Sequence, residues 1–473
     1  MSDKEIITPE QEKELKTEKV KVPTEPRKGK NSKLKYAIYI LIVVIVTVVA
    51  VILSVGNNYK EVFKQLGQAN MGWLIIMCGV MLGSILLEAF ILFVFARLYS
   101  RDYKYHQALA VEQIGVFYSD VTPGATGGQF MEAYTFQKQG LQVSNAVSML
   151  AMYSIVYQLV LSGYGILAFV LKFNFLNEIG GVTLTFGSLG SINISIWALT
   201  IIGFLLNIGL ALLLFLMSYW KKFHNFIMGP CVGLLDKIHI VKNADKTREN
   251  LKVQVENFKI ELRRLFSNIP FTILVTIFFI LLLTLRFSLP YFAGLALGNQ
   301  STHANFFDGV LLSNYHQMVT GIIPIPGAAG VTEYFFLQLF VNTSNPASGF
   351  FYMGATAEVG EVVASSSLAS AALLLWRTVS FTFPLVVSGF VTAFYRTKGK
   401  PAARITDNMP NRQTMIDIIR ETLVERENEL NMILTTATLS KEAISKRLNV
   451  THKKDEKIVD HTHDNDDFTE IDI

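Results

Sequence analysis

The chain has 473 residues, of which 51% are hydrophobic and 17% are charged, and its formal net charge is +4. Soluble domains carry about 25% charged residues, so this composition excludes an ordinary soluble protein, and two lone cysteines make neither a disulfide framework nor a metal site. The apolar residues gather in runs, and because about 20 in a row span the hydrocarbon core of a bilayer, they predict a polytopic membrane protein.

The N-terminal segment, residues 1–35, is polar and rich in Lys, Glu, Thr and Pro. Such a composition cannot bury a core, so we expect disorder. The apolar run that follows, residues 36–55, begins too far from the N-terminus and is too long for a cleavable signal peptide. It is therefore predicted to be the first permanent span. Basic residues directly before it place the N-terminus in the cytoplasm by the positive-inside rule.

Long apolar segments predict six spans, at residues 36–55, 73–96, 146–171, 194–218, 270–297 and 367–394. Lys and Arg are frequent after the second span, throughout residues 220–268 and after the last span, whereas residues 173–192 contain neither. The positive-inside rule therefore places both termini and the loop 220–268 in the cytoplasm, with residues 56–70 and 173–192 outside. We expect a multi-pass protein of the plasma membrane.

Two intermediate regions, residues 105–145 and 304–350, are too polar and too rich in glycine for simple lipid-facing spans. The charge pattern requires each region to return to the side that it left. A helix pair that dips into the membrane would satisfy this, and so would an even number of short full spans. Irregular backbone at membrane depth is tolerated only where protein covers it or where it lines a water-filled cavity.

The predicted fold is accordingly an all-α membrane bundle, with about six full spans and two broken or re-entrant helical regions in an inverted repeat. Three parts are expected along the chain. Residues 1–35 form a basic cytoplasmic tail, residues 36–397 form the transmembrane domain, and residues 398–473 form a cytoplasmic segment with a helix near 411–434 and an acidic end.

Each intermediate region contains a similar glycine motif followed by a glutamate. The first reads Pro123-Gly124-Ala125-Thr126-Gly127-Gly128-Gln129 with Glu132, and the second reads Pro324-Ile325-Pro326-Gly327-Ala328-Ala329-Gly330 with Glu333. Proline breaks a helix, and glycine permits backbone conformations that other residues avoid. A turn at membrane depth followed by a new helix offers free N–H groups to an anion such as a lipid phosphate.

The two glutamates, Glu132 and Glu333, are expected in the first helical turns after the glycines. They could cap those helices, bind a cationic headgroup or carry a proton, and we expect both to approach one shared cavity. The alternative is that the small residues only let helices pack closely. Arg377, expected near the outer third of the last span, could meet a phosphate or a glutamate, or form a purely structural ion pair.

Other charges interrupt or border the apolar runs at Glu88, Arg286, Glu358 and Glu361. Such charges are costly in a membrane unless they are paired or face water, although Arg286 could simply lie near the interface. The chain contains no P-loop, no Cys-x-x-Cys, no Gly-x-Ser-x-Gly and no His-Glu-x-x-His. We therefore expect no ATP-driven pump within this chain, no metal, no cofactor and no nucleic-acid partner.

At its two motifs the sequence resembles the lysylphosphatidylglycerol synthase transmembrane-domain family, which includes the flippase half of bacterial lysylphosphatidylglycerol synthase/flippase proteins. The resemblance also includes Arg377 in a Leu-Leu-Trp-Arg context and covers residues 36–397. Ala328 departs from it, because the family commonly has a second glycine there. The resemblance implies that a membrane phospholipid is the partner, and that it binds at Pro123, Gly124, Thr126, Gly127, Gly128, Gln129, Glu132, Pro324, Pro326, Gly327, Gly330, Glu333 and Arg377.

The function that the resemblance implies is movement of a charged phospholipid between leaflets. Bifunctional members also carry a soluble aminoacyltransferase domain, for which residues 398–473 are expected to be too short. Two alternatives remain open. One is lysylphosphatidylglycerol synthase activity, alone or with a separate catalytic partner. The other is a membrane scaffold for envelope synthesis that docks partners on the loop 220–268 and the C-terminal tail. A homo-oligomer is compatible with any of the three.

Overall fold

The computed structural model describes residues 59–174, 176, 181–185, 191–237, 244–321, 328, 330–341, 346–354, 360–396, 428 and 431–432. The predictions for residues 1–35, for the first apolar run and for nearly all of residues 398–473 lie outside this part of the chain. The described residues are almost entirely helical, as predicted. The exception is a hairpin of β1 (Gly181–Thr185) and β2 (Ser191–Ser195), which pair antiparallel with Gly181 opposite Ser195.

Within the described residues, four helical segments are long and apolar enough to cross a membrane. They are α4 (Met71–Arg97), most of α7 (Val143–Leu171), α13 (Ile269–Phe287) continued by α14 (Leu289–Ala296), and α17 (Glu361–Arg377) continued by α18 (Phe383–Phe394). All four coincide with predicted spans. A fifth predicted span corresponds to α9 (Ile196–Tyr219), a helix of 24 residues without a charged side chain.

Asparagine side chains cap the N-termini of three helices. Asn70 caps α4 by accepting hydrogen bonds from the N–H groups of Gly72, at 2.9 Å, and Trp73. Asn268 caps α13, and Asn305 caps α15 (Phe306–Thr320). Each side chain satisfies N–H groups that have no partner within the helix. The caps therefore fix where the chain turns back into the bundle.

The long helices expose rows of large apolar side chains. On α4 these are Ile75, Leu82, Leu86 and Phe90, and similar rows occur on α7 and α13. Spacings of four and seven residues place such side chains on one helix face. A soluble monomer rarely exposes contiguous apolar surface of this extent. Together with the four candidate spans, the exposed rows identify an integral membrane protein.

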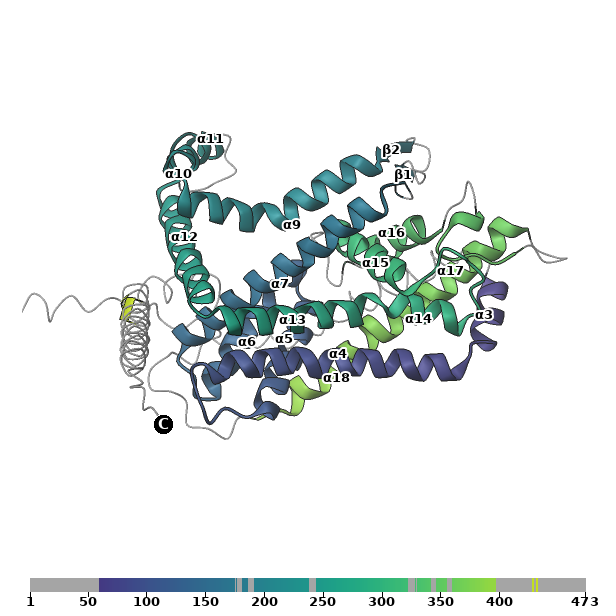
Figure 1. The fold of residues 1–473 in the computed structure, drawn as a ribbon, viewed down its shortest axis with the longest axis horizontal. Coiled ribbons are helices and arrows are strands. Elements are labelled where there is room, and N and C mark those ends of the chain that lie inside the picture. Colours follow the sequence, from purple (N-terminus) through teal and green to yellow (C-terminus); the bar gives the residue numbers. More distant parts are fainter. Residues whose placement is uncertain are drawn as a thin grey trace, which may run out of the picture.

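The two intermediate regions each fold as a pair of short helices. The first contains α5 (Tyr105–Val121), a 3₁₀ turn, η2 (Pro123–Ala125), and α6 (Thr126–Lys138). The second contains α15 and α16 (Val331–Phe340). At a rise of about 1.5 Å per residue, α6 is about 20 Å long and α16 about 15 Å, so neither crosses a core about 30 Å thick. The two pairs lie toward opposite ends of the long helices (Figure 1).

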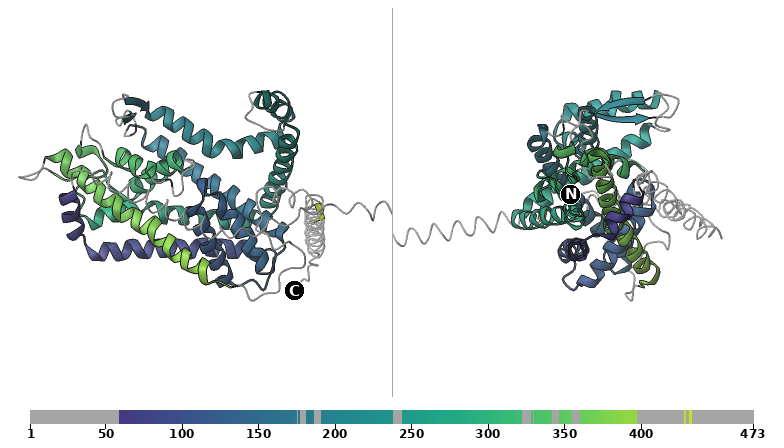
Figure 2. Two further views of the ribbon diagram at one scale, coloured as in Figure 1. Left: turned by 180° about the vertical axis from the view of Figure 1, so that it is seen from behind. Right: turned by 90° about the vertical axis from the view of Figure 1, so that its right-hand side faces the viewer.

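The long helices pack around these pairs. Helix α4 lies beside α13 and α14, while α5 contacts α4, α6 and α18, and α15 contacts α7, α9 and α16 (Figure 1). Seen from behind, α17 and α18 run diagonally across the bundle (Figure 2). A π-helical turn, η7 (Thr378–Thr382), joins α17 to α18. The helix pairs are thus enclosed between the long helices.

The remaining helices lie at the two ends of the bundle, with α10, α11 and α12 at one end and α3 at the other (Figure 1). Helix α12 (Ala244–Ser267) contacts α7, α9 and α13, and α10 (Lys221–Phe226), a π turn, η4 (Ile227–Cys231), and α11 (Val232–Lys237) precede it. The short helix α3 (Tyr59–Gly67) contacts α17. The buried Glu261 of α12 accepts a hydrogen bond from Ser148 of α7 at 2.9 Å. This bond ties α12 to the bundle.

The Gln139 side chain links α5, α6 and α18 through hydrogen bonds. Its side chain accepts a hydrogen bond from the Tyr103 hydroxyl and donates to the Gln107 carbonyl, at 3.0 Å, and to the Tyr395 hydroxyl, at 2.9 Å. These residues lie at the start of α5, the end of α6 and the end of α18. These hydrogen bonds therefore fix the first helix pair against the last long helix.

Candidate functional site

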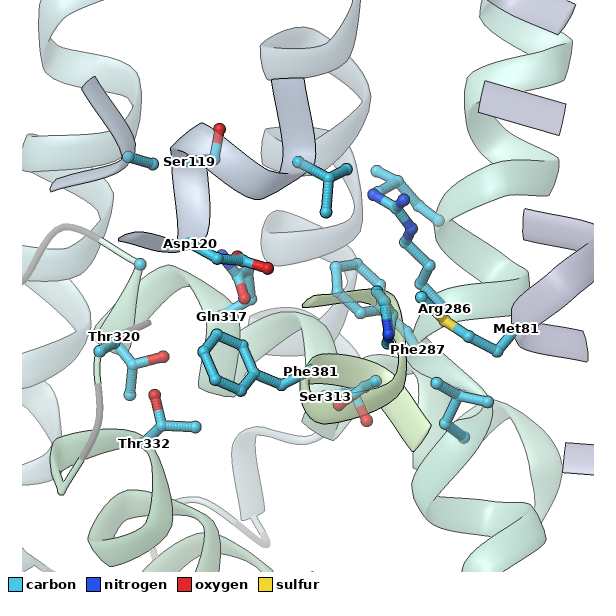
Figure 3. Close-up of a pocket in the computed structure, with 18 of the residues that line it drawn as sticks. Met81, Ser119, Asp120, Arg286, Phe287, Ser313, Gln317, Thr320, Thr332 and Phe381 are labelled. Carbon is cyan, nitrogen blue, oxygen red and sulfur yellow. The ribbon is translucent and has the colours of Figure 1, made fainter. Parts of the chain in front are cut away.

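The helix pairs and long helices enclose a cavity of about 420 Å³ (Figure 3). Its wall is built from single faces of several helices, at spacings of three, four and seven residues. The wall residues include Met81, Ile85 and Glu88 of α4, Glu112, Val116, Ser119 and Asp120 of α5, and Ser313, His316, Gln317 and Thr320 of α15. Acidic, basic and hydroxyl side chains therefore meet apolar ones around one cavity inside a membrane protein.

Both glycine turns reach this cavity. Gly124 and Ala125 of the first turn and Ala328 of the second line its wall. All three have left-handed backbones, with φ of 62°, 53° and 47°, and Gly330 has φ of 86°. Alanine seldom adopts this conformation, and Ala125 and Ala328 are the only non-glycine residues that do so in the described part of the chain. The described residues of both motifs thus include left-handed positions, and Gly124, Ala125 and Ala328 lie beside the same cavity.

Two glycines of the first motif have a packing role instead. A Cβ atom at Gly128 would overlap the Ser119 hydroxyl and lie 2.9 Å from the Gly115 carbonyl, and one at Gly127 would lie 2.7 Å from the Thr122 side chain. Neither glycine lines the cavity in the described structure. They allow α6 to lie directly against α5, which is the alternative reading of these small residues.

Other residues of the first motif also face away from the described cavity wall. Thr126 is exposed, and Gln129 donates a hydrogen bond to Ser154 of α7 at 2.8 Å. The Gly127 N–H group donates to the Thr122 hydroxyl at 2.9 Å. This N–H group at the start of α6 is therefore already satisfied within the protein. Pro123 begins the η2 turn.

Glu132 lines the cavity, but it is not in the first turn of its helix. Helix α6 begins at Thr126 and has no acidic residue in its first turn. The expectation that Glu132 lies in the first turn was therefore wrong, because the helix begins at the threonine between the glycines. The side chain instead lies over Gly115 of α5, where a Cβ atom would come 2.6 Å from its Cγ atom. Its carboxylate is thus available to the cavity.

Glu333, unlike Glu132, lies in the first turn of its helix and caps it. It lies in the first turn of α16 and accepts a hydrogen bond from the Gly330 N–H group at 2.6 Å. Its other oxygen lies 2.7 Å from Arg377 Nε, and Glu333 is 1% exposed. Glu333 is not part of the described cavity wall. We expected both glutamates to approach one cavity: Glu132 lines the described wall, whereas Glu333 is not a wall residue but pairs with the wall residue Arg377.

Arg377 connects Glu333 to the cavity, because the arginine itself lines the wall. It is the last residue of α17, near the middle of the apolar segment Glu361–Phe394. Its guanidinium lies over the Phe381 ring, 4.2 Å from the centroid. Cation–π contact and the ion pair together hold the arginine at the cavity edge.

A second ion pair, between Glu88 of α4 and Arg286 of α13, also lines the wall. Tyr153 of α7 donates its hydroxyl to the same glutamate. Arg286 is thus held by an ion pair and lines the cavity. Sequence reasoning noted both charges without connecting them.

Among the wall residues that were missed are Glu112, Asp120 and His316. The His316 ring lies 2.9 Å from the Thr332 carbonyl. Glu112, Val116, Ser119 and Asp120 follow helical spacing within a region otherwise poor in charge, which was a usable signal. Predicted site residues Pro324, Pro326 and Gly327 lie outside the described residues.

Comparison with known families decides the assignment. Residues 38–357 match the family described as the lysylphosphatidylglycerol synthase TM region. The chain belongs to this family. No curated protein and no solved structure matches it. The match to the lysylphosphatidylglycerol synthase TM region ends at residue 357, before α17 begins. Arg377 therefore lies beyond the matched residues, whereas its partner Glu333 lies within them.

Proposed function

We propose that this protein moves a charged phospholipid between the leaflets of a bacterial plasma membrane, with the cavity as the path of the headgroup. The observation that carries the proposal is the meeting of both glycine turns and charges of both signs at one cavity inside a membrane protein. Charged side chains in a membrane are costly and mark the paths of substrates or ions. Membership of the family supports a role with membrane lipids.

The headgroup would use both signs of charge. Arg286 and Arg377 are the two basic side chains other than histidine among the described residues of the wall, and they are suited to the lipid phosphate. Glu112, Asp120 and Glu132 are suited to a cationic group such as the amine of an aminoacylated lipid. A cavity of about 420 Å³ is of a size for a headgroup, while acyl chains would remain in the bilayer.

The proposed topology follows the charge pattern. Six spans would cross the membrane, with both termini in the cytoplasm. The pairs α5–α6 and α15–α16 would enter from opposite sides as the broken elements of an inverted repeat. Their positions toward opposite ends of the long helices support this arrangement (Figure 1). Alternating access would then expose the cavity to each leaflet in turn.

Leaflet-resolved lipid movement in proteoliposomes tests the proposal. Purified protein is reconstituted, labelled lysylphosphatidylglycerol or phosphatidylglycerol is added to the outer leaflet, and the fraction protected from an external quencher is followed with time. We expect faster protection of at least one charged lipid than in protein-free vesicles. The proposal would be contradicted if every lipid became protected no faster in the proteoliposomes than in protein-free vesicles. Formation of lysylphosphatidylglycerol from charged tRNA by the same preparation would favour the synthase alternative.

A further inference from the structure

Carboxylates outnumber cations in one part of the cavity. Glu88, Glu112 and Glu132 come from α4, α5 and α6, and Arg286 from α13. Arg286 forms its ion pair with Glu88. The other two carboxylates have no ion pair with a described residue, although Glu88, Glu132 and Arg286 all lie close enough to Glu112 to act on its charge. The group therefore holds two more carboxylates than it can pair.

Glu112 is the most enclosed of the three. It is 1% exposed, and its Oε2 atom accepts a hydrogen bond from Gln113 at 2.7 Å. Its Oε1 atom is buried and has no hydrogen-bond partner. Of the elements packed against α5, α4 brings Glu88 and, as its last residue, Arg97, which lies over the Phe93 ring and does not line the cavity. Helix α6 brings Glu132, and η2 and α18 bring no charged residue. The only cation of α6, Lys138, lies over the Tyr134 ring.

A hydroxyl from another helix points to a ligand in the same space. Ser313 of α15 lines the cavity and is 6% exposed, and its Oγ atom has no hydrogen-bond partner (Figure 3). Buried polar atoms normally have partners. Ser313 Oγ and Glu112 Oε1 are therefore two unsatisfied atoms on the wall of one cavity, from two different helices. A ligand with donors would satisfy both.

Two neighbouring carboxylates in a site of low dielectric cannot both remain ionised without a counter-charge. A proton supplies it when the cavity is empty, and a cationic headgroup supplies it when the cavity is full. Both neutralise the same oxygens, so binding of one displaces the other. When an ammonium group enters, a carboxylic O–H bond breaks, the proton passes to water, and the resulting carboxylate accepts a hydrogen bond from the ammonium.

We propose that Glu112 and Glu132 hold a proton in the empty cavity and release it when a cationic headgroup binds, so that translocation exchanges lipid for proton. This inference rests on the proposed function and adds its energy coupling. One positive charge enters the site as another leaves it, so the enclosed cluster keeps its charge. A proton gradient across the membrane would then drive the cationic lipid in the direction opposite to the proton.

Proteoliposomes test the exchange directly. Short-chain dioctanoyl lysylphosphatidylglycerol is added outside vesicles that enclose a pH-sensitive dye. Inward lipid movement should make the lumen more alkaline, and an acidic lumen should accelerate lipid uptake. In Glu112→Gln and Glu132→Gln, the proton movement should fall about tenfold or more, and lipid movement should lose its dependence on the pH gradient. Glu261→Gln, which alters a buried carboxylate away from the cavity, should retain that dependence.

A binding measurement separates this inference from the proposed function. Calorimetric titration of detergent-solubilised protein with the same lipid, in two buffers of different ionisation enthalpy, counts the protons released. We expect about one proton per lipid at neutral pH, none with dioctanoyl phosphatidylglycerol, and none in Glu112→Gln/Glu132→Gln. Lipid movement without proton release or gradient dependence would overturn the exchange and leave the proposed function intact. Proton release without lipid movement would support the exchange at this cavity and overturn translocation.

Discussion

The Glu132 side chain occupies the space that a side chain at position 115 would need. A Cβ atom at Gly115 would lie 2.6 Å from Glu132 Cγ. Gly115 and Glu112 are three residues apart on α5, so they share a helix face. The glycine therefore lets α6 place a second carboxylate next to the first. Positioning of the charge depends on the absence of a methyl group as well as on the glutamate.

Gly115→Ala should displace the Glu132 carboxylate and slow lipid movement about tenfold or more, as expected for loss of a charge-assisted contact. The melting temperature should change little, because a flexible side chain can move aside. Vesicle assays and thermal unfolding would be run on the same preparations. Gly79→Ala on α4 is the matched control, since a Cβ atom there meets nothing within 4 Å. Unchanged lipid movement in the Gly115 variant would show that the position of Glu132 is unimportant.

Glu333→Gln should mainly reduce stability, in contrast to Glu132→Gln. Glu333 caps α16 and pairs with the buried Arg377, and breaking a buried ion pair costs about 3–5 kcal/mol. The expected result is a clear fall in melting temperature. Adding Arg377→Met to Glu333→Gln should recover part of the loss, because no buried guanidinium is then left beside a neutral side chain. A melting temperature equal to that of the unchanged protein would contradict this role of Glu333.

Ala125→Gly and Ala328→Gly should each stabilise the protein slightly. A left-handed backbone costs a residue with a Cβ atom about 1–2 kcal/mol, and the greater freedom of glycine in the unfolded chain offsets about 0.4–1 kcal/mol of the gain. We expect a net effect of about 0.5–1 kcal/mol per site, measured by thermal unfolding. Gly→Ala at Gly124, also left-handed, should do the reverse. A loss of stability in both glycine variants would be inconsistent with the two turns.

The topology can be checked by cysteine labelling after replacing Cys78 and Cys231, the two free cysteines. Lys252→Cys on α12 should react only with reagents that reach the cytoplasm, because it lies in the Lys-rich loop 220–268. His303→Cys, in the exposed loop between α14 and α15, should react from outside. Both side chains are exposed, so access depends on the side of the membrane. External labelling of the α12 cysteine would reverse the proposed orientation.

The long helices could be predicted because their apolar runs have the length of a bilayer. The predicted span 73–96 lies within Met71–Arg97, and 270–297 nearly coincides with Ile269–Ala296. The site could be predicted only in part. Glu88 and Arg286 are 198 positions apart, and nothing local links them. Packing brings them together, so their pairing could not be foreseen from hydropathy.

The glycine motifs indicated the correct turns but not the correct roles. Gly127 and Gly128 resemble a binding loop in sequence, yet their positions are explained by the closeness of α5. Glu132 and Glu333 follow the glycines at similar distances in the sequence, but their helices begin at different points of the two motifs. Helix α6 begins before the last glycines, so Glu132 lies beyond the first turn and lines the cavity, whereas α16 begins after Gly330, so Glu333 lies in the first turn and caps the helix. The helical spacing of Glu112 and Asp120 could have identified them, because both occur on one face of α5.

The π turn at Thr378–Thr382 gives the last long helix an unusual tolerance of length. A π turn holds one residue more than an α turn. Deleting one residue there would convert it to α-helix while α17 and α18 keep the faces that they now present to their neighbours. A deletion elsewhere in α17 would instead rotate one half against the other by about 100°. A relative that lacks one residue at this point would therefore keep the same helix bundle. The π turn between Arg377 and Phe381 would be lost in such a relative, and with it the present spacing of the guanidinium and the ring.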